Sequence, residues 1–228
     1  AAVAAQIAGV ILFDIPVLGR LEGVERKGSR DCLGPLTGAA WLLFLSVFLD
    51  FYIFSAAKYA IDAHMDDVAS GYFNVIFMPT SVINLAAGFV IRPVLTYLTD
   101  DWNQGRYPEF VRMLKRISLL IAALGGLAAV LTWLLGRPVL GIMERILGAS
   151  YAGSLVRYHG AFLLIVLGGG FYALLNLHYY VLVILRQQLM IFGIYALLAV
   201  LAAVLAPALV KQGGIAGAAL AYLTLMVV

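Results

Sequence analysis

The sequence is poor in charge and almost free of cysteine. Only 12% of its 228 residues are charged, whereas about a quarter of a typical soluble domain is charged. Cys32 is the only cysteine, which excludes a disulfide framework and a thiolate metal site. The net charge of +3 is modest, and the basic residues gather in short loops, which is typical of membrane orientation. We therefore expect no nucleic-acid partner, no metal ion and no cofactor.

Most of the sequence consists of long apolar runs. The chain is 64% hydrophobic and its mean hydropathy is +1.00, which predicts an integral membrane protein. We expect an all-α, polytopic bundle of about seven transmembrane helices. No nucleophile with an adjacent base, phosphate loop or carboxylate pair stands out, and the loops leave little room for a catalytic domain. The chain is therefore not expected to be an enzyme.

The apolar runs divide the chain into segments. The stretch 19–38 is rich in glycine and charge and is interpreted as a linker. The short piece 139–148, VLGIMERILG, is too short and too charged to cross, so it is expected to lie along the membrane surface. The predicted spans are 1–18, 41–61, 70–98, 117–135, 161–185, 189–210 and 214–228. A start without methionine and an end within an apolar run suggest an internal fragment of a longer protein.

Basic residues favour alternate loops. They are concentrated in the first, third and fifth loops, which the positive-inside rule assigns to the cytoplasm. The third span, residues 70–98, then runs inward, and Arg92 falls in its cytoplasmic half. The fourth loop, which contains three arginines, fits this assignment least well.

A polar stripe marks the third span. Asn74, Ser81, Asn84, Gly88 and Arg92 stand at offsets of 0, 7, 10, 14 and 18 residues. On a helix these positions lie within an arc of roughly 80° and extend over about 27 Å. A lipid-facing helix does not need such a stripe, whereas a helix that lines a wet cavity or packs through small and polar residues does.

Arg92 directly precedes a proline. Pro93 lacks a backbone N–H, which leaves the carbonyl of Phe89 without its helical partner and predicts a kink. A charge beside a kink within the membrane favours a substrate pathway, in which the guanidinium would bind an anionic group such as a phosphate. The alternative is an arginine that snorkels to cytoplasmic phospholipid.

Two more charges interrupt the second span. Asp50 is near its middle and is interpreted either as a cavity-facing carboxylate, for a cation, a proton or a sugar hydroxyl, or as a carboxyl group that ties two helices together. Lys58 either binds substrate or snorkels outward and pairs with Asp62, four residues later.

The fifth span carries an aromatic and polar face. Tyr172, Asn176, Tyr179 and Tyr180 are spaced so that they share one side of a helix. Such a face stacks on sugar rings in some sites, but helix packing with an interfacial belt is the interpretation we favour. His178 has no histidine or cysteine at ligand spacing, so we do not expect it to bind a metal.

Four stretches resemble a known family. They are SAAKYAID (residues 55–62), the long segment from YFNVIFMPTS to FVRMLKRI (72–117), VLVILRQQ (181–188) and VKQGGIAGAALAYLTLMVV (210–228). In order and spacing they are similar to the C-terminal half of the polysaccharide, or O-antigen type, flippases of the multidrug/oligosaccharidyl-lipid/polysaccharide exporter superfamily. The resemblance covers nearly the whole chain from about residue 38 onward.

The resemblance implies an architecture and an activity. Residues 1–18 would be the last helix of a preceding, missing half, residues 19–38 a cytoplasmic linker, and residues 39–228 a six-helix lobe whose last helix is truncated. The activity implied is flipping of a polyprenyl-pyrophosphate-linked oligosaccharide across the bacterial plasma membrane, with membrane lipid and the missing half as partners. The expected substrate-binding residues are Asp50, Lys58, Asn74, Ser81, Asn84, Arg92 and Asn176.

Two other functions remain open from the sequence. One is a cation-coupled multidrug exporter of the same superfamily. The other is a membrane-embedded glycan polymerase or ligase, which would need a sizeable outer loop with catalytic arginine or histidine. The predicted outer loops are small, so the sequence favours transport.

Overall fold

The computed structural model describes residues 30–147 and 155–228, and side chains from residue 40 onward. The predicted first span, residues 1–18, and most of the predicted linker lie outside these ranges. The chain divides into two compact units, residues 1–39 and residues 40–228, and the packing and sites described below are those of the second unit. The elements of the described residues are α3 (Arg30–His64), α4 (Asp67–Asn103), α5 (Tyr107–Leu147), the 3₁₀ helix η3 (Leu155–Tyr158), α6 (His159–Ile184) and α7 (Gln188–Val227).

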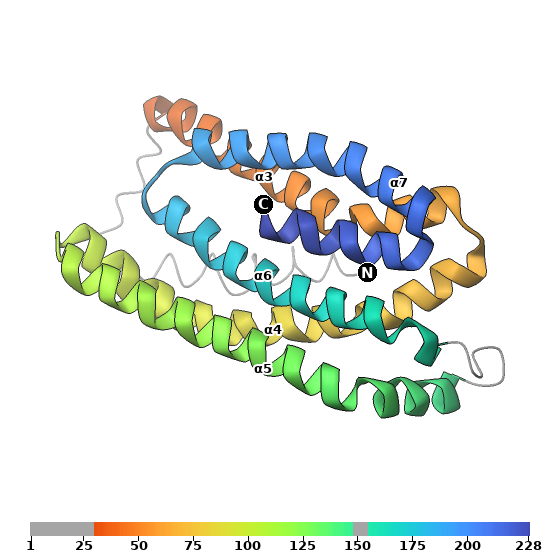
Figure 1. Cartoon of the computed structure of the whole chain (residues 1–228). Coiled ribbons are helices and arrows are strands. Elements are labelled where there is room, and N and C mark those ends of the chain that lie inside the picture. The colour runs from red at the N-terminus through yellow and green to blue at the C-terminus, as the bar shows by residue number, and fades with distance from the viewer. Residues whose placement is uncertain (1–29, 148–154) are drawn as a thin grey trace, which may run out of the picture. The chain divides into compact units, whose positions relative to one another are not determined.

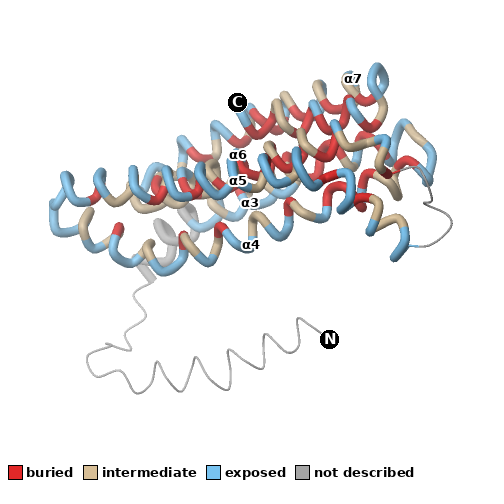
Figure 2. Tube along the Cα trace, turned by 60° about the horizontal axis from the view of Figure 1, so that its bottom comes forward, coloured by how far each residue is buried: buried red, intermediate tan, exposed pale blue. Residues whose placement is uncertain are grey.

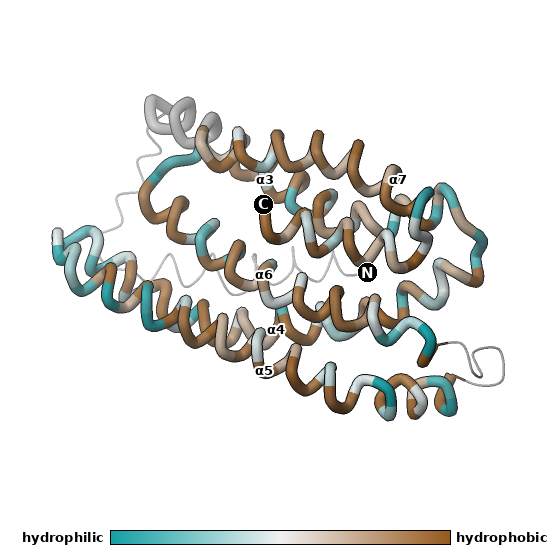
Figure 3. Tube along the Cα trace, in the orientation of Figure 1, coloured by the Kyte–Doolittle hydropathy of each residue, from teal (hydrophilic) through white to brown (hydrophobic). Residues whose placement is uncertain are grey.

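Helices make up the described part of the chain, as the long apolar runs predicted. Five of them are long and apolar enough to cross a membrane. Figure 3 shows hydrophobic residues along the lengths of the helices and hydrophilic residues concentrated where the chain turns. The expectation of an all-α membrane protein is therefore confirmed, but the count of about seven spans is not.

The difference in count arises partly in α7. The predicted sixth and seventh spans both fall within this one helix, whose backbone leaves helical geometry at Gly214, with φ 54° and ψ −132°. Such a positive φ suits glycine, which has no Cβ to clash with the backbone. At this residue the chain turns back on itself, so that α7 has two antiparallel arms (Figure 1).

One further sequence expectation is wrong. The stretch 139–148 does not begin as a separate surface helix, because α5 continues through Pro138 to Leu147. Leu140 is fully buried in the main apolar cluster, and this burial holds the end of α5 against the bundle. Helix α3 begins at Arg30, within the predicted linker 19–38, so residues 30–38 are helical. That this segment connects two lobes stays a prediction.

Helix α6 lies at the centre of the bundle and packs against α4, α5 and α7. One buried cluster joins residues of α3, α4, α6 and α7 with Leu140 of α5 and Leu155 of η3, and a second joins α4, α5 and α6. Where α5 crosses α6, a Cβ on Gly125 would lie 3.2 Å from Cα of Gly170, so the two backbones are in close contact. Figure 2 shows buried residues where helices face one another and exposed residues on their outer sides, which in a bilayer contact lipid.

Short turns with polar residues connect the helices. Asp66 caps α4 by accepting a hydrogen bond from the amide of Ala69 at 3.0 Å, as is usual for an N-cap aspartate. Between α4 and α5, Gly105 adopts a φ of 71° and Arg106 forms an ion pair with Asp101 at 2.6 Å. The turns after α4 and α6 lie at one end of the bundle, and the α3–α4 turn lies at the other (Figure 1).

Candidate functional site

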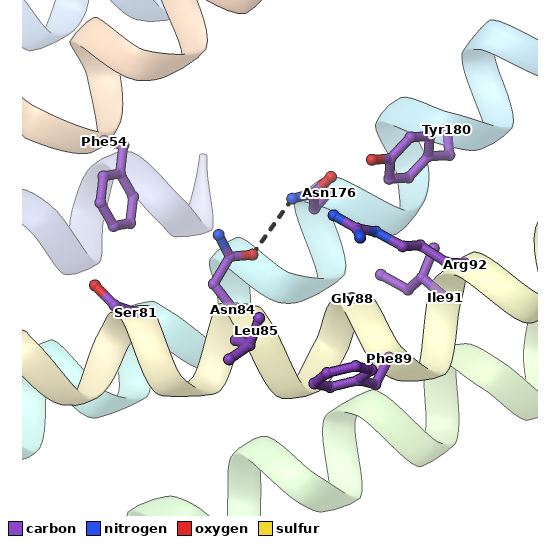
Figure 4. Close-up of a pocket in the computed structure, with 10 residues that line it drawn as sticks. All are labelled: Phe54, Ser81, Asn84, Leu85, Gly88, Phe89, Ile91, Arg92, Asn176 and Tyr180. Carbon is purple, nitrogen blue, oxygen red and sulfur yellow. Dashed lines mark hydrogen bonds between the residues drawn. The ribbon is translucent and has the colours of Figure 1, made fainter. Parts of the chain in front are cut away.

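A pocket of about 330 Å³ lies beside α4 and α6, with one residue of α3 at its edge. Its lining residues are shown in Figure 4: Phe54 of α3; Ser81, Asn84, Leu85, Gly88, Phe89, Ile91 and Arg92 of α4; and Asn176 and Tyr180 of α6. We call this the α4–α6 pocket. It combines apolar walls with a few polar groups, which is the usual composition of a small-molecule site.

Amide and guanidinium groups face one another across the pocket. The side-chain amide of Asn176 donates a hydrogen bond to the amide oxygen of Asn84 at 3.4 Å. This distance is longer than the usual ~2.9–3.0 Å of an N–H···O bond, so the two amides are only weakly paired. Arg92 extends toward Asn176 and Tyr180 (Figure 4). The pocket therefore offers hydrogen-bond donors and one positive charge to a ligand.

The arginine side chain passes close to Gly88. A Cβ on Gly88 would lie 4.0 Å from Nε of Arg92, so the arginine side chain runs back along α4 beside the glycine. This direction is expected, since helical side chains point toward the N-terminus of their helix. It brings the guanidinium to the same part of the pocket as Gly88.

The pocket is open on the α4 side. Ser81, Leu85, Phe89 and Arg92 are all exposed, with Phe89 at 73% of its full surface. Two of these are large apolar side chains, which lie beside the polar groups. A ligand with an anionic or hydroxyl-rich part and an apolar part would find both surfaces here.

The structure divides the seven predicted site residues into two groups. Ser81, Asn84, Arg92 and Asn176 line the α4–α6 pocket. The remaining three, Asp50, Lys58 and Asn74, are not among its lining residues, and Asn74 is exposed on α4. Whether any of the seven binds substrate stays a prediction.

Asp50 lies in a separate group of tyrosines from α6 and α7. The Tyr172 hydroxyl donates a hydrogen bond to its carboxylate at 2.8 Å, and the Tyr195 hydroxyl lies near the same carboxylate. Tyr222, from the second arm of α7, is fully buried close by, and its hydroxyl has no hydrogen-bond partner within the described residues. We call these four residues the Asp50–tyrosine cluster. It ties α3 to α6 and α7, which agrees with the structural interpretation of Asp50 without excluding a functional one.

Lys58 contacts an aromatic ring. Its Nζ lies 4.6 Å from the centre of the Phe77 ring, within the range of a cation–π interaction. Asp62, which the sequence suggested as its partner, accepts a hydrogen bond from the hydroxyl of Ser70. Lys58 is half-buried. It is thus held against α4 by an aromatic surface inside the bundle.

The residues of the aromatic and polar face predicted on α6 lie in three different environments. Tyr172 bonds to Asp50, Asn176 and Tyr180 line the α4–α6 pocket, and Tyr179 packs edge-on against Tyr195 at 5.9 Å. The preference for helix packing therefore describes part of this face, since two of its four residues border a cavity.

Sequence reasoning missed Phe54, Tyr195 and Tyr222. Phe54 stands in the run FLDFYIF, where nothing distinguishes it from its aromatic neighbours. Tyr195 and Tyr222 carried a usable signal, because each is a lone tyrosine among apolar residues, and a hydroxyl in an apolar helix usually has a polar neighbour. Pairing them with Asp50 required the tertiary structure.

Comparisons with known proteins identify no relative: no family model matches the chain, and no curated protein or solved structure matches it either. The class that fold and site define is a helical membrane protein with a polar pocket among its candidate spans. The resemblance to polysaccharide flippases stays a prediction.

Proposed function

We propose that this chain is part of a bacterial plasma-membrane transporter that flips a polyprenyl-pyrophosphate-linked oligosaccharide during the synthesis of cell-surface polysaccharide. The observation that carries the proposal is the α4–α6 pocket. A stripe of polar residues on one helix, singled out from the sequence, borders a cavity that also receives Asn176 and Tyr180 from another helix. Polar groups inside a membrane bundle are costly and tend to mark substrate pathways.

Pocket chemistry supports an anionic, hydroxyl-rich substrate. Arg92 provides a planar, permanently charged donor that suits phosphate oxygens. Asn84, Asn176 and Ser81 provide donors and acceptors for hydroxyl groups. The volume of about 330 Å³ is at the lower end of the ~300–1,000 Å³ typical of ligand sites. The pocket therefore fits a headgroup-sized part of such a substrate and not the whole molecule.

The test is substitution of Arg92 in the full-length protein. One charge-assisted contact contributes about 1.5–3 kcal/mol, so Arg92→Ala should lower flipping of a lipid-linked oligosaccharide by roughly ten- to a hundredfold. Arg92→Lys keeps the charge but loses the bidentate geometry, and it should remain partly active. Flipping is measured in proteoliposomes from the protection of the labelled sugar against an external oxidant.

The control is Arg112→Ala, which removes an exposed arginine of α5 outside the pocket. It should leave flipping unchanged. Near-normal flipping by both Arg92 variants, at normal amounts in the membrane, would assign Arg92 to snorkelling and would contradict an anionic substrate.

A second candidate is a cation-coupled multidrug exporter, and the Asp50–tyrosine cluster favours it. This cluster places a carboxylate among hydroxyl groups inside an apolar bundle, and such groups are used to bind cations or protons. Export of a cationic dye by the purified protein, without flipping of the lipid-linked sugar, would support this candidate over the first.

A further inference from the structure

One end of the α4–α6 pocket is lined by an aromatic ring from a third helix. Among the lining residues, Phe54 comes from α3, whereas the others belong to α4 and α6. In Figure 4 its ring lies on the Ser81 side of the pocket, away from Arg92 and Tyr180. Phe54 is therefore at the end of the pocket opposite to its positive charge.

Three other rings hold Phe54 in place. Its ring centre is 4.7 Å from that of Tyr172, 5.2 Å from that of Phe77 and 5.9 Å from that of Tyr222. These are ordinary aromatic contact distances. Phe77 and Tyr222 are almost completely buried, whereas Phe54 is half-buried. Phe54 is thus the member of this group with free space on one side, which is the pocket.

A second cation lies just past this ring. Lys58 is one helical turn beyond Phe54 on α3, and its ammonium group rests over Phe77, the ring that Phe54 also contacts. Phe77 and Arg92 are 15 residues apart on α4, which corresponds to about 22 Å of helix. The polar residues Ser81 and Asn84 stand between them on the same helix. Phe54 and Phe77 therefore separate two positive charges that a polar stripe would otherwise connect.

We infer that Phe54 is a gate, which closes the α4–α6 pocket toward Lys58 and opens to give an anionic group access from Arg92 to Lys58. The inference rests on the proposed transport function, since a gate between two cationic positions serves movement of an anion. Movement of one half-buried ring is a side-chain rearrangement and does not require the helices to separate. The Tyr172 ring, which contacts Phe54, also bonds to Asp50, so the gate adjoins the Asp50–tyrosine cluster.

The experiment measures how fast a cysteine at position 58 reacts with a membrane-impermeant methanethiosulfonate. The background is the full-length protein without cysteine, in which Cys32→Ser removes the one cysteine of this chain. Arg92→Cys first identifies the membrane side from which the pocket is reached. Lys58→Cys should react slowly from that side. Because a minor open state is typically ~0.1–10% populated, adding Phe54→Ala should accelerate the reaction about tenfold or more.

Phe51→Ala is the matched control, because Phe51 is on the same helix but 62% exposed, away from the aromatic group. It should leave the rate unchanged. Phe54→Leu retains an apolar side chain without the ring contacts and should give an intermediate rate, which keeps the test decisive if the alanine variant does not fold. Reaction of Lys58→Cys as fast as Arg92→Cys with Phe54 intact, or no acceleration in either Phe54 variant, would overturn the gate.

The labelling experiment and the transport experiment test the gate and the proposed cargo independently. The labelling rate uses no transported substrate, so a normal gate with no flipping of lipid-linked oligosaccharide would reject the proposed cargo and leave the gate standing. Normal flipping with no effect of the Phe54 substitutions on labelling would reject the gate and leave the proposed cargo standing.

Discussion

The α4–α6 pocket and the Asp50–tyrosine cluster are both polar sites among apolar helices, yet the first is open and the second is closed. In the pocket, Nδ2 of Asn176 lies 3.4 Å from Oδ1 of Asn84, and Ser81 and Arg92 are exposed. In the cluster, Tyr172 bonds to Asp50 at 2.8 Å. The pocket keeps its hydrogen-bonding capacity for a ligand, whereas the cluster uses much of its own capacity internally.

This difference indicates that the pocket is suited to ligand binding and the cluster to stabilising the contact between helices. Polar groups that are satisfied by one another stabilise the contact between helices, while groups left open at a cavity can bind a ligand. Phe54 lies between the two, since its ring lines the pocket and contacts Tyr172 of the cluster. Substitutions that disturb the packing of the cluster should therefore affect stability first, whereas substitutions that remove a charge or a pocket group should affect transport first.

The largest effect is expected from Gly217→Ala, which disturbs the cluster from outside. A Cβ on Gly217 would lie 1.9 Å from the carbonyl oxygen of Leu209, on the other arm of α7. Since backbone atoms cannot rotate away, the arm that carries Tyr222 must shift, at a cost of about 3 kcal/mol or more. We expect a clear loss of thermal stability in detergent. Gly213→Ala is the control, because a Cβ there meets nothing within 4 Å; equal stability of the two variants would contradict the packing of the two arms.

A smaller effect is expected from Asp50→Asn, which removes the charge but keeps an oxygen that accepts the Tyr172 hydroxyl. We expect folded protein in the membrane with transport lowered about tenfold, equivalent to ~1.4 kcal/mol in the barrier. The matched control is Asp67→Asn, an exposed carboxylate in the first turn of α4, which should transport normally. Normal flipping by well-expressed Asp50→Asn would leave Asp50 with a purely structural role.

The smallest effect is expected in an experiment that compares the Asp50–Tyr172 and Asn84–Asn176 hydrogen bonds directly. Double-mutant cycles of unfolding free energy, with Asp50→Ala and Tyr172→Phe for the cluster, should give a coupling of about 1 kcal/mol. The cycle with Asn84→Ala and Asn176→Ala should give about 0.5 kcal/mol or less, because the bond is long. A larger coupling for the asparagines would mean that the pocket, too, is closed by its own residues.

Much of the pocket was predictable because one helix provides most of it. Residues at helical spacing share a face whatever surrounds the helix, so the stripe of Ser81, Asn84, Gly88 and Arg92 could be read from the sequence. Asn176 was also singled out from the face it shares with Tyr180. Its position opposite Asn84 could not be predicted, since it depends on how α6 packs against α4.

The sequence by itself determined the all-helical class, the membrane-spanning character and the polar face of α4, since composition and helical periodicity are local properties. The tertiary structure decided the rest. It located the break between the predicted spans 189–210 and 214–228 at Gly214, continued α5 through Pro138, and placed Tyr172, Tyr195 and Tyr222 around Asp50. These features depend on contacts between residues far apart in the chain. Apolar side chains fit many such contacts equally well, and close packing selects among them only once the helices are assembled.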